Sequence, residues 1–249
     1  MVENPTTEMC HGLGCNSTDL IDAHIVPQGH ARFIRDAHHN LILSKTATRK
    51  TPQLGDTDRH ILCGDCDRQL GAHDEVLIAA ARDFRRLHKN LGQVWVLPSV
   101  DADKFAKAVF AILWRASISR RSNFASFSLG RYEERVRDIL FGKTAFTDNA
   151  DISMLVQRYT SKHFDTSKLY TYPSPAPFEG LNSAGFALAG LRILAKFDPR
   201  PLPTGLWPFD VPHVGIVRGA YIEFEKAPEF DHIAEMVAND MVRSARQRS

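Results

Sequence analysis

Apolar residues recur at helical spacing before residue 90 and predict one long helix there. Its apolar face consists of Leu70, Leu77, Ala81, Phe84 and Leu87. Residues three, four or seven apart share one side of a helix, so we predict a helix from residue 67 to about 88. Two short apolar runs precede it, at 20–26 and 60–63, and predict strands. The mostly polar stretch 28–59 between them predicts an irregular loop.

The remainder of the chain mixes helical and strand patterns. Helices are predicted at about 101–120, 131–141 and 229–246, and strands at 93–97, 186–197 and 213–224. Asp101 or Asp103 offers an N-cap for the first of these helices, and Gly142 ends the second. The stretch 170–178 holds three prolines and predicts a connection. We therefore predict an α+β fold, with an N-terminal strand–loop–strand–helix module at residues 1–90 packed on a mixed helix and strand region at 91–249.

Composition changes this picture little, because it is that of an ordinary globular protein. The chain has 249 residues, of which 43% are hydrophobic and 24% charged. No apolar run approaches the roughly 18 residues of a membrane span, and the N-terminus does not resemble a secretory signal. We therefore expect a cytoplasmic protein with no membrane partner. The net charge of +2 does not by itself identify a nucleic-acid partner. A local basic cluster, Lys45, Arg49 and Lys50, offers candidate nucleic-acid contacts.

The four cysteines of the chain fall into two close pairs, Cys10-x4-Cys15 and Cys63-x2-Cys66. Two such loops from distant segments are typical of a closed site in which four thiolates hold a structural Zn²⁺. The alternative is that the four are unrelated buried cysteines. We favour the zinc site, since chance rarely places every cysteine of a long chain in two such pairs. Zinc then has a structural role, and any chemistry lies beside it.

Three sequence segments extend this pattern. They read AHIVP at residues 23–27, ILCGDCDRQLGAHD at 61–74 and LWRASIS at 113–119, and SLGRYEERVRDIL follows at 128–140. The chain resembles the zinc-stapled HNH endonucleases, which have a ββα-metal or treble-clef fold. More narrowly, it resembles a group of uncharacterised bacterial proteins that join these motifs, and the resemblance covers most of the chain. It implies a metal-dependent hydrolase that cleaves phosphodiester bonds in DNA, and less readily in RNA, with a possible role in bacterial or phage conflict.

The resemblance assigns roles to residues on the two strands. His24 matches the general base, which takes a proton from the attacking water. Asp22 lies two residues before it, so both side chains share one strand face. Asp58 lies five residues before Cys63, where the family often has an asparagine. The residue before the base, commonly a metal ligand in this family, is Ala23 here.

Three residues on the predicted helix complete the candidate site. Asp67 directly follows the second cysteine pair and opens the helix, and His73 and Asp74 lie about two turns further on. Together with Asp22 and Asp58 they are candidate ligands of a catalytic Mg²⁺ or Mn²⁺, since these ions favour carboxylate oxygen. Each has a simpler alternative. His24 could hydrogen-bond the backbone of the module, Asp67 could be an N-cap, and His73 and Asp74 could lie on a solvated helix face.

Three functions remain open on the sequence. The first is the HNH-type nuclease with His24 as base. The second is a catalytically inactive zinc-stapled module that binds nucleic acid, a protein partner or another copy of the chain. Ala23 and the missing asparagine favour this second function. In the third, the region from residue 91 onward senses a ligand or partner and gates the module.

Overall fold

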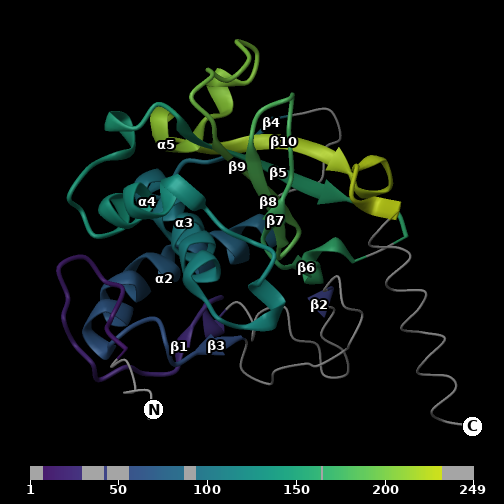
Figure 1. Ribbon diagram of the computed structural model, residues 1–249. Helices are drawn as coiled ribbons and strands as arrows, with labels where there is room; N and C mark the ends of the chain where they lie inside the picture. The colour runs from purple at the N-terminus through teal and green to yellow at the C-terminus, as the bar shows by residue number, and fades with distance from the viewer. Residues whose placement is uncertain (1–7, 30–41, 44–55, 87–93, 164, 232–249) are drawn as a thin grey trace, which may run out of the picture.

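The computed structural model describes residues 8–29, 42–43, 56–86, 94–163 and 165–231 of the chain (Figure 1). Its largest element is an eight-stranded sheet with the order β2-β6-β8-β9-β5-β10-β4, in which β7 also pairs with β8. The strands are β2 (Ile42–Leu43), β4 (Val94–Leu97), β5 (Ile152–Thr160), β6 (Tyr170–Thr171), β7 (Ser174–Pro175), β8 (Ser183–Leu188), β9 (Leu191–Phe197) and β10 (Val217–Glu223). β5 is central, because it pairs with β9 in antiparallel and with β10 in parallel orientation.

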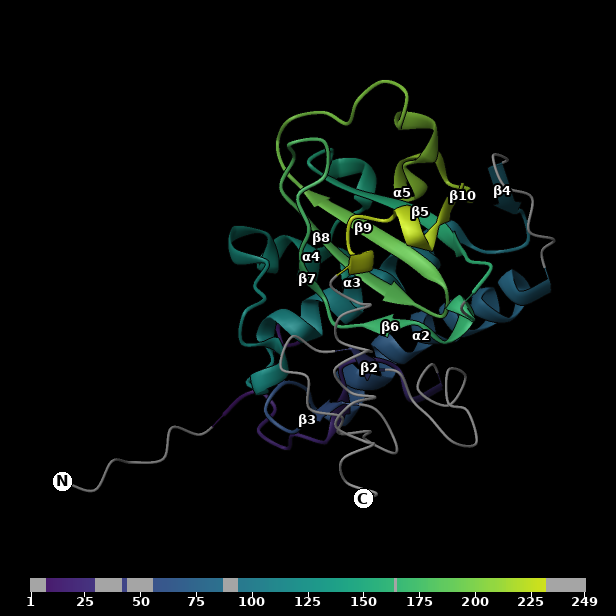
Figure 2. The ribbon, with the colours of Figure 1, turned by 90° about the vertical axis from the view of Figure 1, so that its right-hand side faces the viewer.

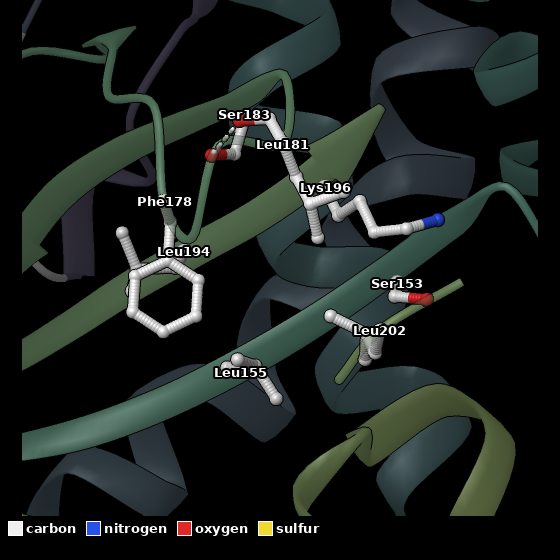
Figure 3. A pocket seen from close by; sticks show the side chains of 8 residues that line it. All are labelled: Ser153, Leu155, Phe178, Leu181, Ser183, Leu194, Lys196 and Leu202. Atoms are coloured by element: carbon white, nitrogen blue, oxygen red, sulfur yellow. Dashed lines mark hydrogen bonds between the residues drawn. The ribbon is translucent and has the colours of Figure 1, made fainter. Parts of the chain in front are cut away.

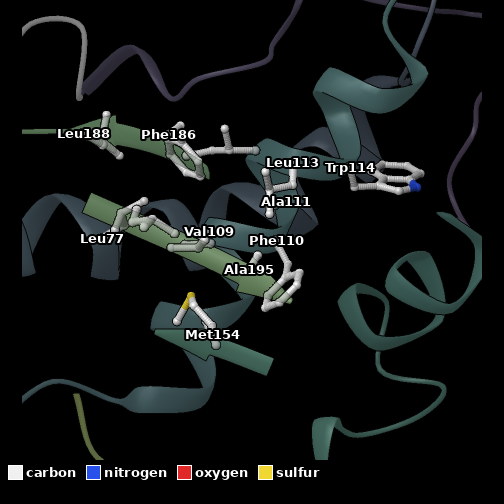
Figure 4. Close-up of a cluster of buried hydrophobic side chains, with 14 of the residues drawn as sticks. Leu77, Val109, Phe110, Ala111, Leu113, Trp114, Met154, Phe186, Leu188 and Ala195 are labelled. Carbon is white, nitrogen blue, oxygen red and sulfur yellow. The ribbon is translucent and has the colours of Figure 1, made fainter. Parts of the chain in front are cut away.

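A helix that is apolar on nearly all sides packs against this sheet. α3 (Ala102–Ile118) begins at the N-cap Asp101, whose side chain accepts a hydrogen bond from the Lys104 backbone nitrogen at 3.0 Å. Its buried residues contact β5, β8 and β9 on one side and α2 (Gly64–Arg86) and α4 (Glu133–Leu140) on the other (Figure 4). An all-round apolar helix is expected where packing occurs on several sides, so α3 is the centre of the fold.

Most predicted helices are confirmed within the described residues. α2 covers 67–86 of the predicted 67–88 and begins earlier, at Gly64, while residues 87 and 88 lie outside the described part of the chain. α3 covers most of 101–120, and α4 covers most of 131–141. The predicted helix at 229–246 lies almost wholly outside the described residues. The mixed α+β fold class is confirmed.

Three strand predictions need correction. The apolar stretch at 186–197 is a hairpin, because Ala189 and Gly190 have φ values of 51° and 84° and form a tight turn between β8 and β9. The stretch at 213–224 begins with the short helix α5 (Val211–Val214), and only then does β10 start. The strand predicted at 60–63 lies earlier, as β3 (Thr57–Asp58), and residue 63 makes only an isolated bridge to Leu20.

The first 90 residues are tied to the rest of the molecule. β1 (Ala23–His24) pairs with β3 in antiparallel orientation and forms a separate two-stranded sheet. β2, however, lies in the stretch predicted as a loop and pairs with β6 in parallel orientation, so it adds a strand to the large sheet. One cluster of buried apolar residues extends from Cys10 to Val217. Figure 2 shows the small β3 region below the large sheet, on the side where β2 joins β6.

Candidate metal centre

The four cysteines converge in space. Their sulfur atoms all lie within 4.8 Å of one another, and Cys15 Sγ and Cys63 Sγ are 3.7 Å apart. All four are free thiols rather than disulfides. A tetrahedral ion with bonds of about 2.3 Å to sulfur requires sulfur atoms about 3.8 Å apart. The four cysteines are therefore close enough to hold one metal ion, and four sulfur donors are the set that zinc commonly takes.

Local backbone geometry explains this convergence. The backbone N–H groups of Gly12 and Cys63 both donate to Cys10 Sγ, at 3.4 and 3.3 Å. A side chain at Gly12 would place its Cβ 2.3 Å from Cys66 Sγ, so only glycine fits there. Hydrogen bonding from the Cys66 backbone lowers the pKa of Cys63 to about 7, whereas burial raises the pKa values of Cys10 and Cys66. N–H groups directed at sulfur favour the thiolate, which is the form that binds metal.

His24 lies on β1, opposite Thr57 of β3. Its side chain is half-buried, and the Nε2 atom is buried without a hydrogen-bond partner in the described structure. Ala23, beside it, is fully buried. The nearby Asp22 side chain is 56% exposed and lies 3.7 Å from the Arg59 guanidinium. His24 thus carries an unused ring nitrogen, and Asp22 forms a surface ion pair.

Asp58 is a fully buried carboxylate that receives three hydrogen bonds. Ser119 Oγ and the Arg120 backbone nitrogen donate to Oδ2 at 2.7 and 2.9 Å, and the His60 backbone nitrogen donates to Oδ1 at 2.9 Å. Burial alone would raise the pKa of Asp58, but these three donors outweigh it and the pKa lies below its usual value. Asp58 therefore connects β3 to the C-terminal end of α3.

The Asp74 side chain connects α2 to α3. Arg115 of α3 donates to its Oδ2 from both terminal nitrogens, at 3.1 and 3.0 Å, and both side chains are buried. The prediction of a solvated position is therefore wrong for Asp74. A buried pair of this geometry fixes the packing of α2 on α3.

The two remaining helix candidates differ from each other. Burial lowers the pKa of His73, so its imidazole is neutral at ordinary pH, and its Nδ1 atom has no hydrogen-bond partner in the described structure. Asp67 lies in the first turn of α2, and its backbone nitrogen donates to the Cys63 carbonyl at 3.0 Å. A carboxylate at this position is favourable next to the positive end of the helix dipole.

The structure brings the cysteines together but does not bring the other candidates into a second group. Within the described residues, the four cysteines are the only set of three or more histidine, cysteine or acidic side chains whose ligand atoms converge. Among His24, Asp22, Asp58, Asp67, His73 and Asp74, no three ligand atoms converge in this way. Lys45, Arg49 and Lys50 lie outside the described residues.

Sequence reasoning missed the partners that occupy Asp58 and Asp74. Ser119 and Arg115 both belong to the LWRASIS segment. An arginine there can anchor a carboxylate or a phosphate, but the sequence does not say which group it meets. A third residue of this segment, Ser117, donates to Glu133 of α4 at 2.7 Å. Polar residues on an otherwise apolar helix were the available signal, because such groups must find partners when buried.

A small hollow on the large sheet is closed to ligands. It is lined by Leu155 of β5, Leu194 of β9 and three apolar side chains of the adjoining loops, with Ser153, Ser183 and Lys196 as polar groups (Figure 3). Its volume of about 10 Å³ is at most that of one water molecule. Lys196 Nζ donates to the Asp198 carbonyl at 2.6 Å, so this buried lysine has a structural partner. This hollow offers no substrate site.

Comparison with known proteins adds no relative to this picture: no protein family, curated protein or solved structure matches the chain. None of the helices in the described residues combines the length and the apolar character that crossing a membrane requires.

Proposed function

We propose that the four cysteines hold a structural Zn²⁺ and that the module they staple binds nucleic acid without hydrolysing it. The zinc proposal rests on the convergence of four sulfur atoms at the spacing of a tetrahedral site. Elemental analysis of purified protein should find one zinc per chain. A metal-free protein that is fully folded would contradict this part of the proposal.

The observation that carries nucleic-acid binding is a group of three exposed arginines around the end of β3. Arg59 and Arg120 have side chains that are 70% and 63% exposed, and Arg121 is also exposed. Arg121 Nε donates to the Thr57 carbonyl at 2.6 Å, and Arg120 pairs with Glu8. Arg59 lies 3.7 Å from Asp22, and all three arginine side chains stay exposed despite these contacts. Guanidinium groups presented in this way suit phosphate oxygens.

The engagement of the carboxylates favours binding over hydrolysis. Asp58 already accepts three hydrogen bonds, and Asp74 is paired with Arg115 inside the protein. A magnesium site would have to take these oxygens from their partners, and Ala23 supplies no ligand at all. The partners that already engage these carboxylates, together with Ala23, support binding over hydrolysis with a catalytic Mg²⁺ or Mn²⁺.

Salt-dependent binding to labelled duplex DNA tests this proposal. Each arginine that contacts a phosphate adds about 0.9 to the slope of log affinity against log salt. Replacing Arg59, Arg120 and Arg121 by alanine should weaken binding and flatten that slope. The matched control replaces Arg68, Lys104 and Lys143, three exposed cations elsewhere with the same total charge. Equal slopes for the two triple variants, or a wild-type slope near zero, would refute DNA binding at this surface and leave a protein partner.

A second candidate function, HNH-type cleavage of DNA, is favoured by one specific observation. His24 Nε2 is buried and has no hydrogen-bond partner among the described residues, and an unused imidazole nitrogen is what a general base requires. Plasmid nicking in magnesium or manganese tests it. His24→Ala should abolish nicking, whereas His60→Ala, a histidine of the same module that pairs with Glu8, should not. Absence of nicking by the wild-type protein would exclude this second function.

A further inference from the structure

A hollow of about 240 Å³ lies at one edge of the large sheet, away from the cysteines. One wall comes from residues 127–132, which lead into α4. The other comes from Pro175 of β7, the start of β8 and Phe197 at the end of β9. The volume is below the roughly 300–1,000 Å³ of pockets for drug-sized molecules, so it suits a small ligand.

The wall formed by residues 127–132 is fixed by hydrogen bonds. The Leu129 backbone nitrogen donates to Ser117 Oγ of α3 at 2.9 Å, and that hydroxyl donates to Glu133 at 2.7 Å. The Gly130 backbone nitrogen donates to Ser128 Oγ at 3.0 Å. The hollow is therefore formed before any ligand arrives, and binding would not have to order this segment.

Charge in the hollow has one sign. Arg131 is the only charged residue of its lining, and none of the lining residues is acidic. Its guanidinium carbon lies 5.0 Å above the centre of the Tyr132 ring, and one of its nitrogens donates to the Tyr132 hydroxyl at 3.0 Å. The side chain is exposed and makes no ion pair with any carboxylate in the described part of the chain. Stacking thus orients a guanidinium whose remaining N–H groups are available to an anion.

Aromatic side chains form another part of the lining. Phe127, Tyr132 and Phe197 are buried aromatic residues in its lining, and the rings of the last two are 5.6 Å apart. Aromatic side chains of this kind pack well against another ring. We propose that the hollow binds a small ligand in which one planar ring carries an anionic group, with the anion on Arg131 and the ring against these aromatic side chains.

Four small molecules test the ring and the anionic group together and apart. Phenyl phosphate and benzoate carry both, inorganic phosphate carries only the anion, and benzyl alcohol carries only the ring. Amide NMR spectra of the full-length protein would be followed during titration with each. Phenyl phosphate or benzoate should shift the resonances of residues 127–132 and 182–184. The better of the two should bind at least about tenfold more tightly than phosphate or benzyl alcohol, because only a joined ring and anion uses both parts of the site. Which of the two binds better identifies the anion as phosphate or carboxylate.

Variants of the arginine complete the test. Arg131→Ala should weaken binding of the ring-bearing anion about tenfold. Arg131→Lys should restore only part of it, since lysine keeps the charge but loses the planar fork. Arg68→Ala, which removes an exposed arginine of α2, should leave binding unchanged. The proposal is overturned if both ring-bearing anions bind no more tightly than the separate parts, or if Arg131→Ala binds them as well as the wild type does.

Discussion

The cysteine module and the sheet region are ordered by different forces. In the module, β1 and β3 have two residues each, and four sulfur atoms from segments about fifty residues apart meet at one point. In the sheet region, the 17-residue helix α3 is buried on nearly all sides between strands and helices. A pair of two-residue strands cannot be stable alone, whereas a packed helix on a large sheet can. With the proposed zinc in place, the module depends on coordination as well as on the apolar cluster that it shares with the sheet region, whereas the sheet region depends on apolar burial alone.

Polar side chains of α3 join the two regions. Arg115 pairs with Asp74 of α2, and Ser119 donates to Asp58 of β3. These partners lie 41 and 61 residues apart in the chain. One helix therefore belongs to the core of the sheet region and also fixes the position of the module. Mutations or metal removal can be chosen that act on the module alone, on the joint formed by these two contacts of α3, or on the sheet region alone.

The largest effect is expected from loss of the metal. Structural zinc contributes about 10–16 kcal/mol to the folding of zinc-finger peptides. Chelation, or Cys63→Ser, should remove hydrogen-exchange protection from residues 8–29 and 56–66. Peptides of β5, β8 and β9 should keep theirs. Zinc added back to the chelated wild type should restore protection, and Cys15→His, which keeps a ligand at that position, should retain part of it. Equal loss of protection in both regions would contradict the division between them.

A large effect is also expected at the joint between α2 and α3. Asp74→Ala leaves the buried Arg115 without its partner, and such changes cost about 3–5 kcal/mol. Replacing both residues, as Asp74→Leu with Arg115→Met, should recover much of that loss, because no buried charge remains. Urea unfolding of Asp74→Leu, Arg115→Met and the double variant measures this coupling. Additive losses would show that the pair does not act as a unit.

A smaller effect is expected at the joint between α3 and β3. Ser119→Ala removes one donor to Asp58 and should cost about 1 kcal/mol. Asp58→Ala should cost more, about 1–3 kcal/mol, because the Arg120 and His60 backbone nitrogens lose their acceptor. Ser122→Ala, an exposed serine shortly after α3, is the matched control and should be neutral. A double-mutant cycle on Asp58 and Ser119 should show coupling, and its absence would argue against the observed contact.

The smallest effect lies in the sheet region and depends on pH. The Asp210 carboxylate, 2.9 Å from His213 Nδ1, raises the pKa of His213 above its ordinary value. The stabilisation is therefore complete below the unfolded pKa of about 6.5 and is lost as pH rises through the higher folded pKa. The free energy of unfolding of the wild type, relative to His213→Gln, should fall over that range. A difference that grows with pH would have the wrong sign for this pair.

Much of the helical framework could be predicted from the sequence, because α2, α3 and α4 carry apolar residues at helical spacing. The paired cysteines also predicted the sulfur cluster, because two cysteines a few residues apart in one loop are already close enough to bind the same metal ion. The central strand β5 was not predicted. Eight of its nine residues are buried, so it lacks the alternation of a half-buried strand. The β8–β9 turn was missed because Ala189 continues the apolar run.

The roles of the acidic candidates could not be predicted from the sequence. Asp58 and Asp74 stand at positions that the HNH resemblance associates with the site, and nothing local distinguishes a metal ligand from a structural acceptor. Their partners Ser119 and Arg115 are distant in the chain, and only the packing of α3 brings them close. For His24 the position in β1 agrees with the expected strand, while its chemical role stays a prediction.

The parallel pairing of β2 with β6 has a consequence for any attempt to divide this protein. Between β1 and β3 the chain crosses into the large sheet and then returns. A truncation after residue 90 would take β2 away from the strand it completes and would leave β6 as a bare edge. Gene fragments cut at that point would therefore yield two interdependent halves, and co-expression of both would be needed to reassemble the native topology.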